Sequence, residues 1–227
     1  MADYKPKRIT LFAGHYGSGK TNIAVNFAIK LKNDGLDVKV ADLDIVNPYF
    51  RTKDSTDDLE RAGIELVSPA FANTNVDLPA LPQELYGVVN NKKYYAVLDI
   101  GGDDRGAYAL GRYTPTILEE NDYEMIFVAN FFRPLTKTPE EALEVMREIE
   151  MASKIPFTAI INNSNLGNDT TAKDVESTIE NAKKLSKLSN LPIIFTTVRE
   201  DIKDVEKFEG ELLPIKLQEK YFDIKEI

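Results

Sequence analysis

The sequence predicts an α/β fold: a doubly wound, mostly parallel sheet with helices on both faces. Short apolar runs alternate along the chain with amphipathic stretches. The runs are near-continuously apolar, which is typical of strands that are buried on both faces of a parallel sheet. A regular succession of strand and helix favours the doubly wound arrangement. The chain has 227 residues, and we expect one domain over residues 1–227 because single α/β domains commonly reach this size.

Seven apolar runs are the predicted strands. They cover residues 9–13, 38–43, 64–67, 94–100, 125–129, 157–161 and 193–198. In open α/β sheets, ligands bind beyond the carboxyl ends of the strands. The polar residues that directly follow these runs are therefore the first candidates for a functional site.

Helix signals lie between the predicted strands. Apolar residues recur at helical spacing within residues 23–31, 142–149 and 175–185. Gly35 follows the first stripe and suits a helix C-terminus. Thr138, Pro139 and Glu141 precede the second stripe, with the spacing of an N-cap, a first-turn proline and a capping-box glutamate. The third stripe is predicted to end near Asn190.

Composition excludes several classes of function. There are 28 Lys and Arg residues against 37 Asp and Glu, a net charge of −9, and this acidic balance disfavours broad nucleic-acid binding. No cysteine is present, so disulfides, thiolate nucleophiles and cysteine-ligated metal centres are excluded. No apolar run reaches the ~18 residues of a membrane span, and residues 211–227 do not form the basic amphipathic helix of a membrane anchor. We expect a soluble cytoplasmic protein.

A phosphate-binding loop is the strongest motif in the sequence. It reads Gly14-His15-Tyr16-Gly17-Ser18-Gly19-Lys20-Thr21 and fits G-x-x-x-x-G-K-[ST] between a strand and a helix. Backbone N–H groups of such a loop surround phosphate oxygens, and the following helix directs its positive N-terminus at them. Lys20 is expected on the β- and γ-phosphates and Thr21 on Mg²⁺. The alternative is a glycine-rich turn with an incidental lysine. The glycine spacing does not fit the G-x-G-x-x-G of dinucleotide-binding folds.

Acidic residues end two of the predicted strands. Asp42 and Asp44 end the second strand, and Asp99 ends the fourth, just before Gly101 and Gly102. We expect Asp99 to hold Mg²⁺ through a water. Asp44 is expected beside the same metal, where it orients the attacking water as a catalytic residue together with Lys20. The alternative, in which these carboxylates cap loops or pair with surface lysines, stays open, above all for Asp42.

Together these motifs resemble the MinD/ParA-like branch of P-loop NTPases. The resemblance extends over roughly residues 7–200 and rests on the phosphate loop, the D-x-D motif and the D-x-G-G motif. The branch also contains nitrogenase iron proteins, CooC-type nickel-insertion ATPases and CobQ/CobB-type amide ligases. The resemblance implies a P-loop fold, an ATP-bound homodimer and an adenine-binding groove. Lys20 and Thr21 match the family's invariant pair, Asp44 matches its switch I aspartate, and Asp99 matches its Walker B or switch II aspartate.

One position departs from the family pattern. Many members carry a second lysine early in the loop, which reaches the nucleotide of the partner subunit. His15, the only histidine of the chain, stands there instead, and a neutral imidazole cannot deliver that fixed charge. Arg51 and Arg105 are candidate replacements because an arginine can stabilise transition-state charge.

Base recognition is expected at the ends of the last two predicted strands. In the family an asparagine placed like Asn162 hydrogen-bonds the adenine edge, and an amide can do so because it offers both a donor and an acceptor. Asn163 is the second candidate, and Arg199 is a candidate for the opposite wall of the pocket. The alternative for the asparagines is a loop-capping turn.

Three functions fit these residues. The first is a nucleotide-switch ATPase that binds ATP and ADP and acts on a protein client in maturation or regulation. The second is an ATP-dependent amide ligase or dethiobiotin-synthetase-like enzyme, which needs cations beside the γ-phosphate; Arg51, Arg105, Arg112 and Arg133 are available. The third is a non-hydrolysing ATP-binding scaffold, suggested by the missing signature lysine.

Overall fold

The strands of the protein form one parallel sheet. The computed structural model describes residues 4–43, 56–68, 83–101, 107–108 and 110–217. The strands are β1 (Ile9–Ala13), β2 (Val38–Leu43), β3 (Glu65–Val67), β4 (Tyr95–Ile100), β5 (Tyr123–Ala129), β6 (Ala159–Asn162), β7 (Ile193–Arg199) and β8 (Glu211–Ile215). Within this part of the chain they form an eight-stranded sheet in the order β3-β2-β4-β1-β5-β6-β7-β8, and each neighbouring pair is parallel. The predicted doubly wound fold is confirmed.

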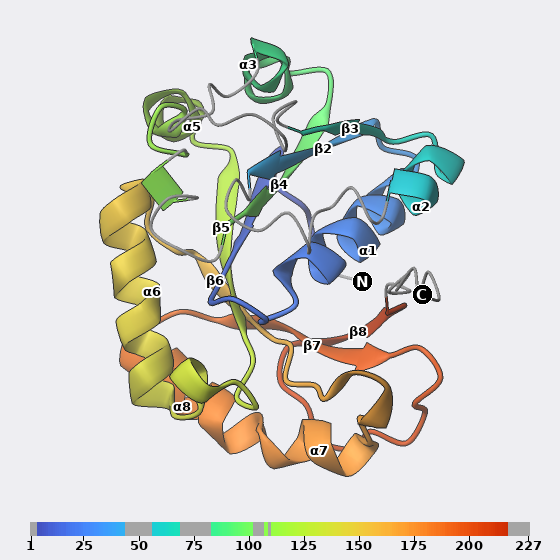
Figure 1. The fold of residues 1–227 in the computed structure, drawn as a ribbon, viewed down its shortest axis with the longest axis vertical. Coiled ribbons are helices and arrows are strands. Elements are labelled where there is room, and N and C mark those ends of the chain that lie inside the picture. Colours follow the sequence, from blue (N-terminus) through green and yellow to red (C-terminus); the bar gives the residue numbers. More distant parts are fainter. Residues whose placement is uncertain (1–3, 44–55, 69–82, 102–106, 109, 218–227) are drawn as a thin grey trace, which may run out of the picture.

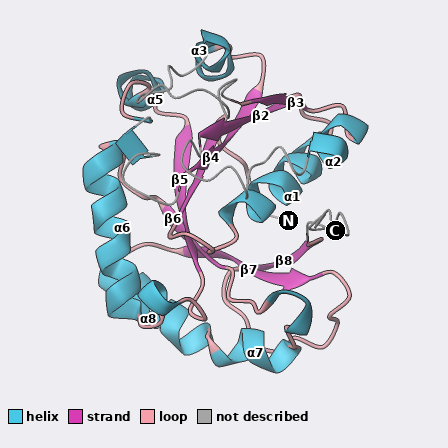
Figure 2. Cartoon of the chain, in the orientation of Figure 1, coloured by secondary structure: helices cyan, strands magenta, loops and turns pink. Residues whose placement is uncertain are grey.

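Helices cover both faces of the sheet (Figures 1 and 2). The helices are α1 (Lys20–Asn33), α2 (Thr56–Arg61), α3 (Gln83–Asn90), α5 (Thr114–Glu120), α6 (Pro139–Ser153), α7 (Ala172–Ser177) and α8 (Ile179–Ser189), with short 3₁₀ turns at η2 (Pro134–Thr136) and η3 (Gly167–Asp169). Figure 1 shows α1 and α2 on one side of the sheet and α3, α5, α6 and α8 on the other. The sheet is therefore the middle of three layers, as the apolar strands predict.

Each face of the sheet has its own hydrophobic core. One core packs Phe27 of α1 and Leu59 of α2 against strand residues that include Phe12. The other packs α3, α5, α6 and α8 against the opposite face, which includes Leu11. Phe12 and Leu11 are neighbours in β1 and both are fully buried, because successive strand residues point to opposite faces. This two-sided burial fixes β1, and hence the loop that follows it, in the middle of the molecule.

The helix ends follow the sequence signals closely. Thr138 is the N-cap of α6, and a complete capping box joins its side chain and backbone to Glu141. Gly35 lies just beyond α1 with a φ of +87°, as expected for a glycine after a helix C-terminus. The stripe over residues 175–185 is divided between α7 and α8, because Thr178 ends one helix and begins the next.

The last strand, β8, was not among the predicted strands. It pairs with β7 alone and ends the sheet. Pro214 lies within it, and an interior proline usually argues against a strand. An edge strand accepts a proline because one side of its backbone has no strand to bond. The predicted strands at 9–13 and 38–43 have the observed bounds, and the others differ by a few residues at one or both ends.

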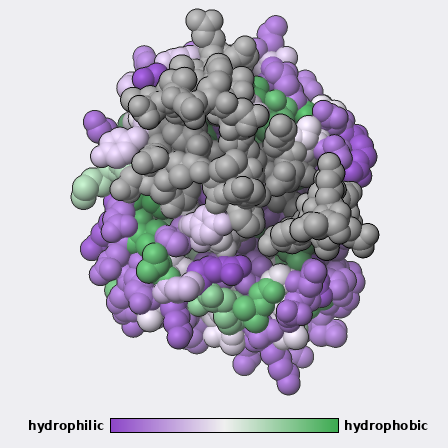
Figure 3. All heavy atoms as spheres, viewed as in Figure 1, coloured by the Kyte–Doolittle hydropathy of each residue, from purple (hydrophilic) through white to green (hydrophobic). Residues whose placement is uncertain are grey.

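The surface is mostly polar. On the face seen in Figure 3, hydrophilic side chains dominate the described residues, and hydrophobic ones form small groups between them. None of the helices in the described ranges is long and apolar enough to cross a membrane.

Candidate functional site

The phosphate loop joins the central strand β1 to the N-terminus of α1. β1 lies between β4 and β5, so the loop emerges at the middle of the sheet's carboxyl edge. Gly17 and Gly19 have φ angles of +75° and +88°, a region that side chains other than glycine rarely adopt. The Ser18 amide donates to the His15 carbonyl at 3.0 Å. This compact turn is the backbone conformation that the motif predicts.

Two glycines of the loop have no room for a side chain. A Cβ atom at Gly14 would lie 2.6 Å from the Val128 carbonyl oxygen. A Cβ atom at Gly19 would lie 2.4 Å from Nδ2 of Asn163. The loop is thus packed directly against the ends of the neighbouring strands β5 and β6, and its position is set by them.

Side chains from those two strand ends hold the outer carbonyls of the loop. Asn163 Nδ2 donates to the Ser18 carbonyl at 2.7 Å, and Arg133 Nε donates to the Gly17 carbonyl at 2.8 Å. Asn163 is itself held by Thr197 of β7, whose hydroxyl donates to Asn163 Oδ1 at 2.5 Å. In a trans peptide the N–H points away from the C=O. Holding the Ser18 carbonyl outward therefore turns the Gly19 N–H toward the inside of the loop.

The N-terminus of α1 gives the loop a positive character. The first N–H groups of a helix have no acceptor within the helix and attract anions. No acidic residue lies in the first turn of α1, so no carboxylate of this turn occupies the position. Lys20, the first residue of the helix, is buried. Backbone amides, a helix N-terminus and a lysine converge here, which is the arrangement that binds phosphate groups.

Thr21 and Asp99 meet directly beneath the loop. The Thr21 hydroxyl donates to Asp99 Oδ2 at 2.5 Å, although the two residues are 78 positions apart in the sequence. Asp99 is the last but one residue of β4 and is fully buried. Asp42 of β2 lies beside it in the parallel register and is also buried. The acidic residue near the end of β4 and the loop threonine thus lie in contact, and their roles as metal ligands stay predictions.

The donor set of Thr21 and Asp99 suits Mg²⁺. Magnesium prefers oxygen ligands and is usually held by one or two protein groups together with phosphates and waters. Within the described ranges, no group of three or more histidine, cysteine, aspartate or glutamate side chains is arranged to hold a metal by itself. A hydroxyl and a carboxylate beside a phosphate loop fit a metal that arrives with its nucleotide.

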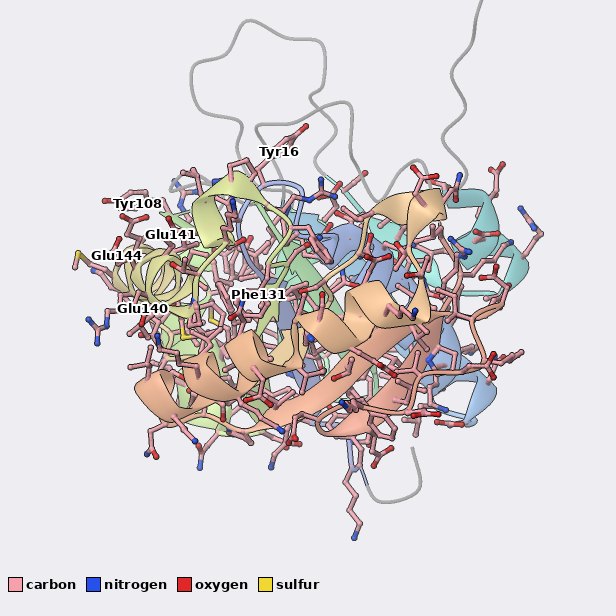
Figure 4. All side chains as sticks on the ribbon, turned by 90° about the horizontal axis from the view of Figure 1, so that it is seen from below. Tyr16, Tyr108, Phe131, Glu140, Glu141 and Glu144 are labelled. Atoms are coloured by element: carbon pink, nitrogen blue, oxygen red, sulfur yellow. The ribbon has the colours of Figure 1, made fainter. Side chains whose placement is uncertain are left out.

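His15 and Tyr16 form the outer tip of the loop. His15 Nδ1 lies 3.0 Å from the Tyr16 carbonyl oxygen. Tyr16 is 48% exposed, and Figure 4 shows it projecting away from the body of the protein, whereas Phe131 lies within it. Both loop residues thus stand on the solvent side of the site.

The predicted base-reading residues are fixed by contacts within the protein. Asn162 Nδ2 donates to Thr178 at 3.0 Å, and Asn162 Oδ1 accepts from the Ser164 hydroxyl at 2.7 Å. Asn163 holds the phosphate loop, as described above. Neither residue is more than 1% exposed. Their predicted contact with adenine stays a prediction.

Arg199 lines a pocket at the carboxyl ends of β7 and β8. The pocket is bounded by Asn165, Gly167, Thr170, Val175, Thr197, Val198, Arg199, Ile215 and Leu217. Arg199 binds Asp201 through Nε and Nη2 and donates through Nη1 to the Asn168 carbonyl at 2.6 Å. The hydrogen bond to Asp201 raises the pKa of Arg199, and the same bond lowers the pKa of Asp201. The guanidinium therefore fastens the loop after β6 to the end of β7.

Several predicted residues lie outside the described residues. These are Asp44, Arg51 and Arg105.

Two residues with close contacts to the site did not come from a motif. Thr197 supports Asn163, and Arg133, noted in the sequence only as an available cation, contacts the loop itself. Thr197 lies within β7 and Arg133 follows β5, and their contacts depend on which strands become neighbours.

The sequence matches the CobQ/CobB/MinD/ParA nucleotide binding domain (CbiA) over residues 9–215. This span contains the phosphate loop, both acidic strand ends and every predicted base-reading residue. No curated protein sequence matches the chain.

Solved structures of FtsY proteins share the fold. The cell division protein FtsY of Thermotoga maritima superposes with a TM-score of 0.58 at 17% identity, covering 91% of this chain and 66% of that one. The chloroplast FtsY of Physcomitrella patens gives 0.61 at 19% identity, with 91% and 63% covered. FtsY of Elizabethkingia anophelis gives 0.53 at 20% identity, also with 91% and 63% covered. The chain spans just under two thirds of these proteins.

Proposed function

Because the chain belongs to the CobQ/CobB/MinD/ParA nucleotide binding domain family, we propose that it binds ATP with Mg²⁺ and hydrolyses it as a switch that acts on a protein client. Nucleotide binding follows from the family and the phosphate loop. The observation that carries the finer proposal is the contact between Thr21 and Asp99. It joins the loop that holds phosphate to the carboxylate that would hold a metal.

The phosphate end of the nucleotide is assigned to the loop and α1. The backbone of residues 14–21 surrounds the phosphates, and Lys20 supplies a charge to the β- and γ-phosphates. Thr21 and Asp99 are the residues that would hold Mg²⁺, directly or through water. When bound, the ion neutralises charge that develops on the phosphates. Asp44 is proposed to orient the attacking water, a role that rests on its sequence position after β2.

The base is proposed to lie toward the ends of β6 and β7. The family resemblance favours adenine. Arg199 and its neighbours line a small hollow at this edge. Asn162 bonds to Thr178, and Asn163 bonds to Ser18 of the phosphate loop, so both amides lie between the phosphate site and the ends of these strands. We propose that Asn162 or Asn163 presents an amide edge to the base, which requires one of their present hydrogen bonds to be exchanged for one to the nucleotide.

We favour the switch role over the alternatives because the proposed γ-phosphate position lies at the phosphate loop, beside the acidic strand ends. A γ-phosphate bound next to switch loops couples hydrolysis to a change of shape, and a homodimer that forms on ATP binding is part of the proposal. A non-hydrolysing scaffold is the second candidate, because His15 occupies the position of the family's second lysine. The two differ in turnover.

The test is ATP hydrolysis by wild type, Lys20→Ala and Asp44→Ala, measured as released phosphate. We expect wild type to release phosphate slowly and Asp44→Ala to bind ATP with near wild-type affinity but to release phosphate at least about tenfold more slowly. Lys20→Ala is expected to lose binding altogether. Normal hydrolysis by Asp44→Ala would refute the role of that residue. Turnover by wild type no faster than by Lys20→Ala would favour the scaffold, and a stoichiometric phosphorylated or amidated metabolite would favour the metabolic enzyme.

A further inference from the structure

Arg133 is a second cation at the phosphate loop that the family pattern does not assign. It follows β5, the strand next to β1, and contacts the loop from its outer side. Its Nε and Cζ atoms lie 3.6 and 4.0 Å from the position that a Gly17 Cβ would take. The guanidinium thus lies against the open face of that glycine.

The backbone around Arg133 is held firmly. Its amide donates to the Asn130 carbonyl at 3.1 Å, and the Thr136 hydroxyl donates to the same carbonyl at 2.7 Å. The Asn130 side chain accepts from the Phe132 amide at 3.1 Å. Pro134 directly follows and begins the turn η2. The side chain therefore projects from a rigid base toward the loop, so little conformational freedom is lost when it acts there.

Within the part of the chain that the structure describes, no carboxylate pairs with the Arg133 guanidinium. A guanidinium stays protonated at all relevant pH values and offers five N–H donors. Among the described residues, its one hydrogen bond from the side chain is the bond from Nε to the Gly17 carbonyl, and it forms no ion pair with a carboxylate there. Both Nη groups carry donors and charge beside the loop. A cation held at a phosphate site without a carboxylate partner is suited to an anion.

We infer that Arg133 is a positioning residue that supplies, from the same chain, a fixed positive charge to the phosphate loop and holds the Gly17–Ser18 peptide in its binding conformation. The inference rests on the proposed nucleotide site. It assigns to Arg133 the charge that His15 cannot provide at the start of the loop, and it requires no partner subunit. The ligand that the loop binds with this support is the polyphosphate of a nucleoside di- or triphosphate.

The experiment compares Arg133→Gln and Arg133→Lys with wild type in titrations of Mg-ADP and Mg-ATP. We expect Arg133→Gln to raise the Kd for both nucleotides about tenfold, because a charge-assisted contact is lost. Arg133→Lys keeps the charge and should recover most of the affinity. A plot of log Kd against log salt should be flatter for Arg133→Gln than for wild type and Arg133→Lys, since one cation fewer is screened.

Lys137→Gln is the matched control. Lys137 directly follows the same turn and is exposed. Its substitution removes the same charge from a side chain that has no described contact with the phosphate loop. It should bind like wild type. The melting temperature of Arg133→Gln shows whether the substitution disturbs the loop alone or the whole fold. The Arg133 contact lies at the surface, so its loss should leave the melting temperature nearly unchanged.

Three results would overturn the inference while leaving the proposed function intact. The first is a wild-type affinity for nucleotide in Arg133→Gln. The second is a loss of affinity that is accompanied by a clearly lowered melting temperature. The third is an Arg133→Lys variant that binds as weakly as Arg133→Gln. Absence of nucleotide binding by wild type itself would overturn both.

Discussion

The two edges of the sheet use their polar side chains in opposite ways. At the amino edge, Arg8 and Glu120 form a buried ion pair, and Arg8 also donates to the Val89 carbonyl at 2.5 Å and to the Tyr94 carbonyl at 3.3 Å. At the carboxyl edge, Lys20 is buried at the start of α1, and Arg133 donates to the Gly17 carbonyl of the phosphate loop. The charges of Arg8 and Glu120 thus stabilise the fold, whereas Lys20 and Arg133 lie at the proposed nucleotide site.

The same contrast holds for the carboxylates. Glu124, the second residue of β5, lies at the amino edge. It accepts hydrogen bonds from Tyr4, from Thr10 at 3.1 Å and from the Lys7 amide at 3.5 Å. Asp99, the last but one residue of β4, lies at the carboxyl edge and contacts a threonine of the phosphate loop. A buried carboxylate whose hydrogen bonds are all made within the fold contributes to stability. A buried carboxylate that contacts a phosphate-binding loop is a candidate functional group. Substitutions at the two edges should separate these effects.

The largest effect on binding is expected from Gly19→Ala at the carboxyl edge. The new Cβ would lie 2.4 Å from Asn163 Nδ2, and the residue keeps a φ of +88°. Moving Asn163 releases the Ser18 carbonyl and disturbs the loop, so nucleotide affinity should fall at least about 100-fold, or ~2.7 kcal/mol. Titration with Mg-ADP measures it.

Gly35→Ala is the control for this substitution. Gly35 has nearly the same φ, +87°, but no atom lies within 4 Å of its Cβ position. It should lose about 1 kcal/mol of stability through backbone strain and bind nucleotide like wild type. Equal affinities for the two alanine variants would contradict the packing of Gly19 against Asn163.

Arg8→Met should show the reverse pattern at the amino edge. It leaves Glu120 and the Val89 carbonyl buried without the guanidinium, and breaking a buried pair in this way costs about 3–5 kcal/mol. Urea unfolding should report this loss. The folded variant should keep the wild-type Kd for nucleotide, and a weakened Kd in a variant of unchanged stability would mean that the two edges are not separate.

A smaller, pH-dependent effect is expected from Glu124→Gln. Burial raises the pKa of Glu124 above its ordinary value of 4.5, so folding favours its protonated form. The stability that protonated Glu124 contributes is fully present below pH 4.5. It is lost as the pH rises through the folded-state pKa, and the unfolding free energy falls by at most about 1.4 kcal/mol per pH unit. Relative to Glu124→Gln, which stays neutral, wild type should lose stability as the pH rises. Unfolding free energies at several pH values test this, and parallel pH profiles would contradict it.

The sequence was most informative where a motif and a strand coincide. The apolar run at 9–13 and the glycines after it predicted both β1 and the loop, because the steric need for glycine is local. Asp99 was placed beside Thr21 because parallel strands end at a common edge. The N-cap at Thr138 was also local and was confirmed.

What the sequence could not supply was contact between distant segments. The bonds from Asn163 to Ser18 and from Arg133 to Gly17 depend on β6 and β5 lying near β1. The edge position of β8, which makes Pro214 acceptable, depends on strand order. Asn162 was predicted to face a base, and its hydrogen bonds to Thr178 and Ser164 arise from packing that periodicity does not reveal.

The most direct measurement is a calorimetric titration of wild type and Lys20→Ala with ATP in the presence of Mg²⁺. We expect wild type to bind one nucleotide per chain saturably, and more strongly with Mg²⁺ than with a chelator. We expect no measurable binding to Lys20→Ala. Absence of heat from wild type, or equal affinities for the two proteins, would contradict it.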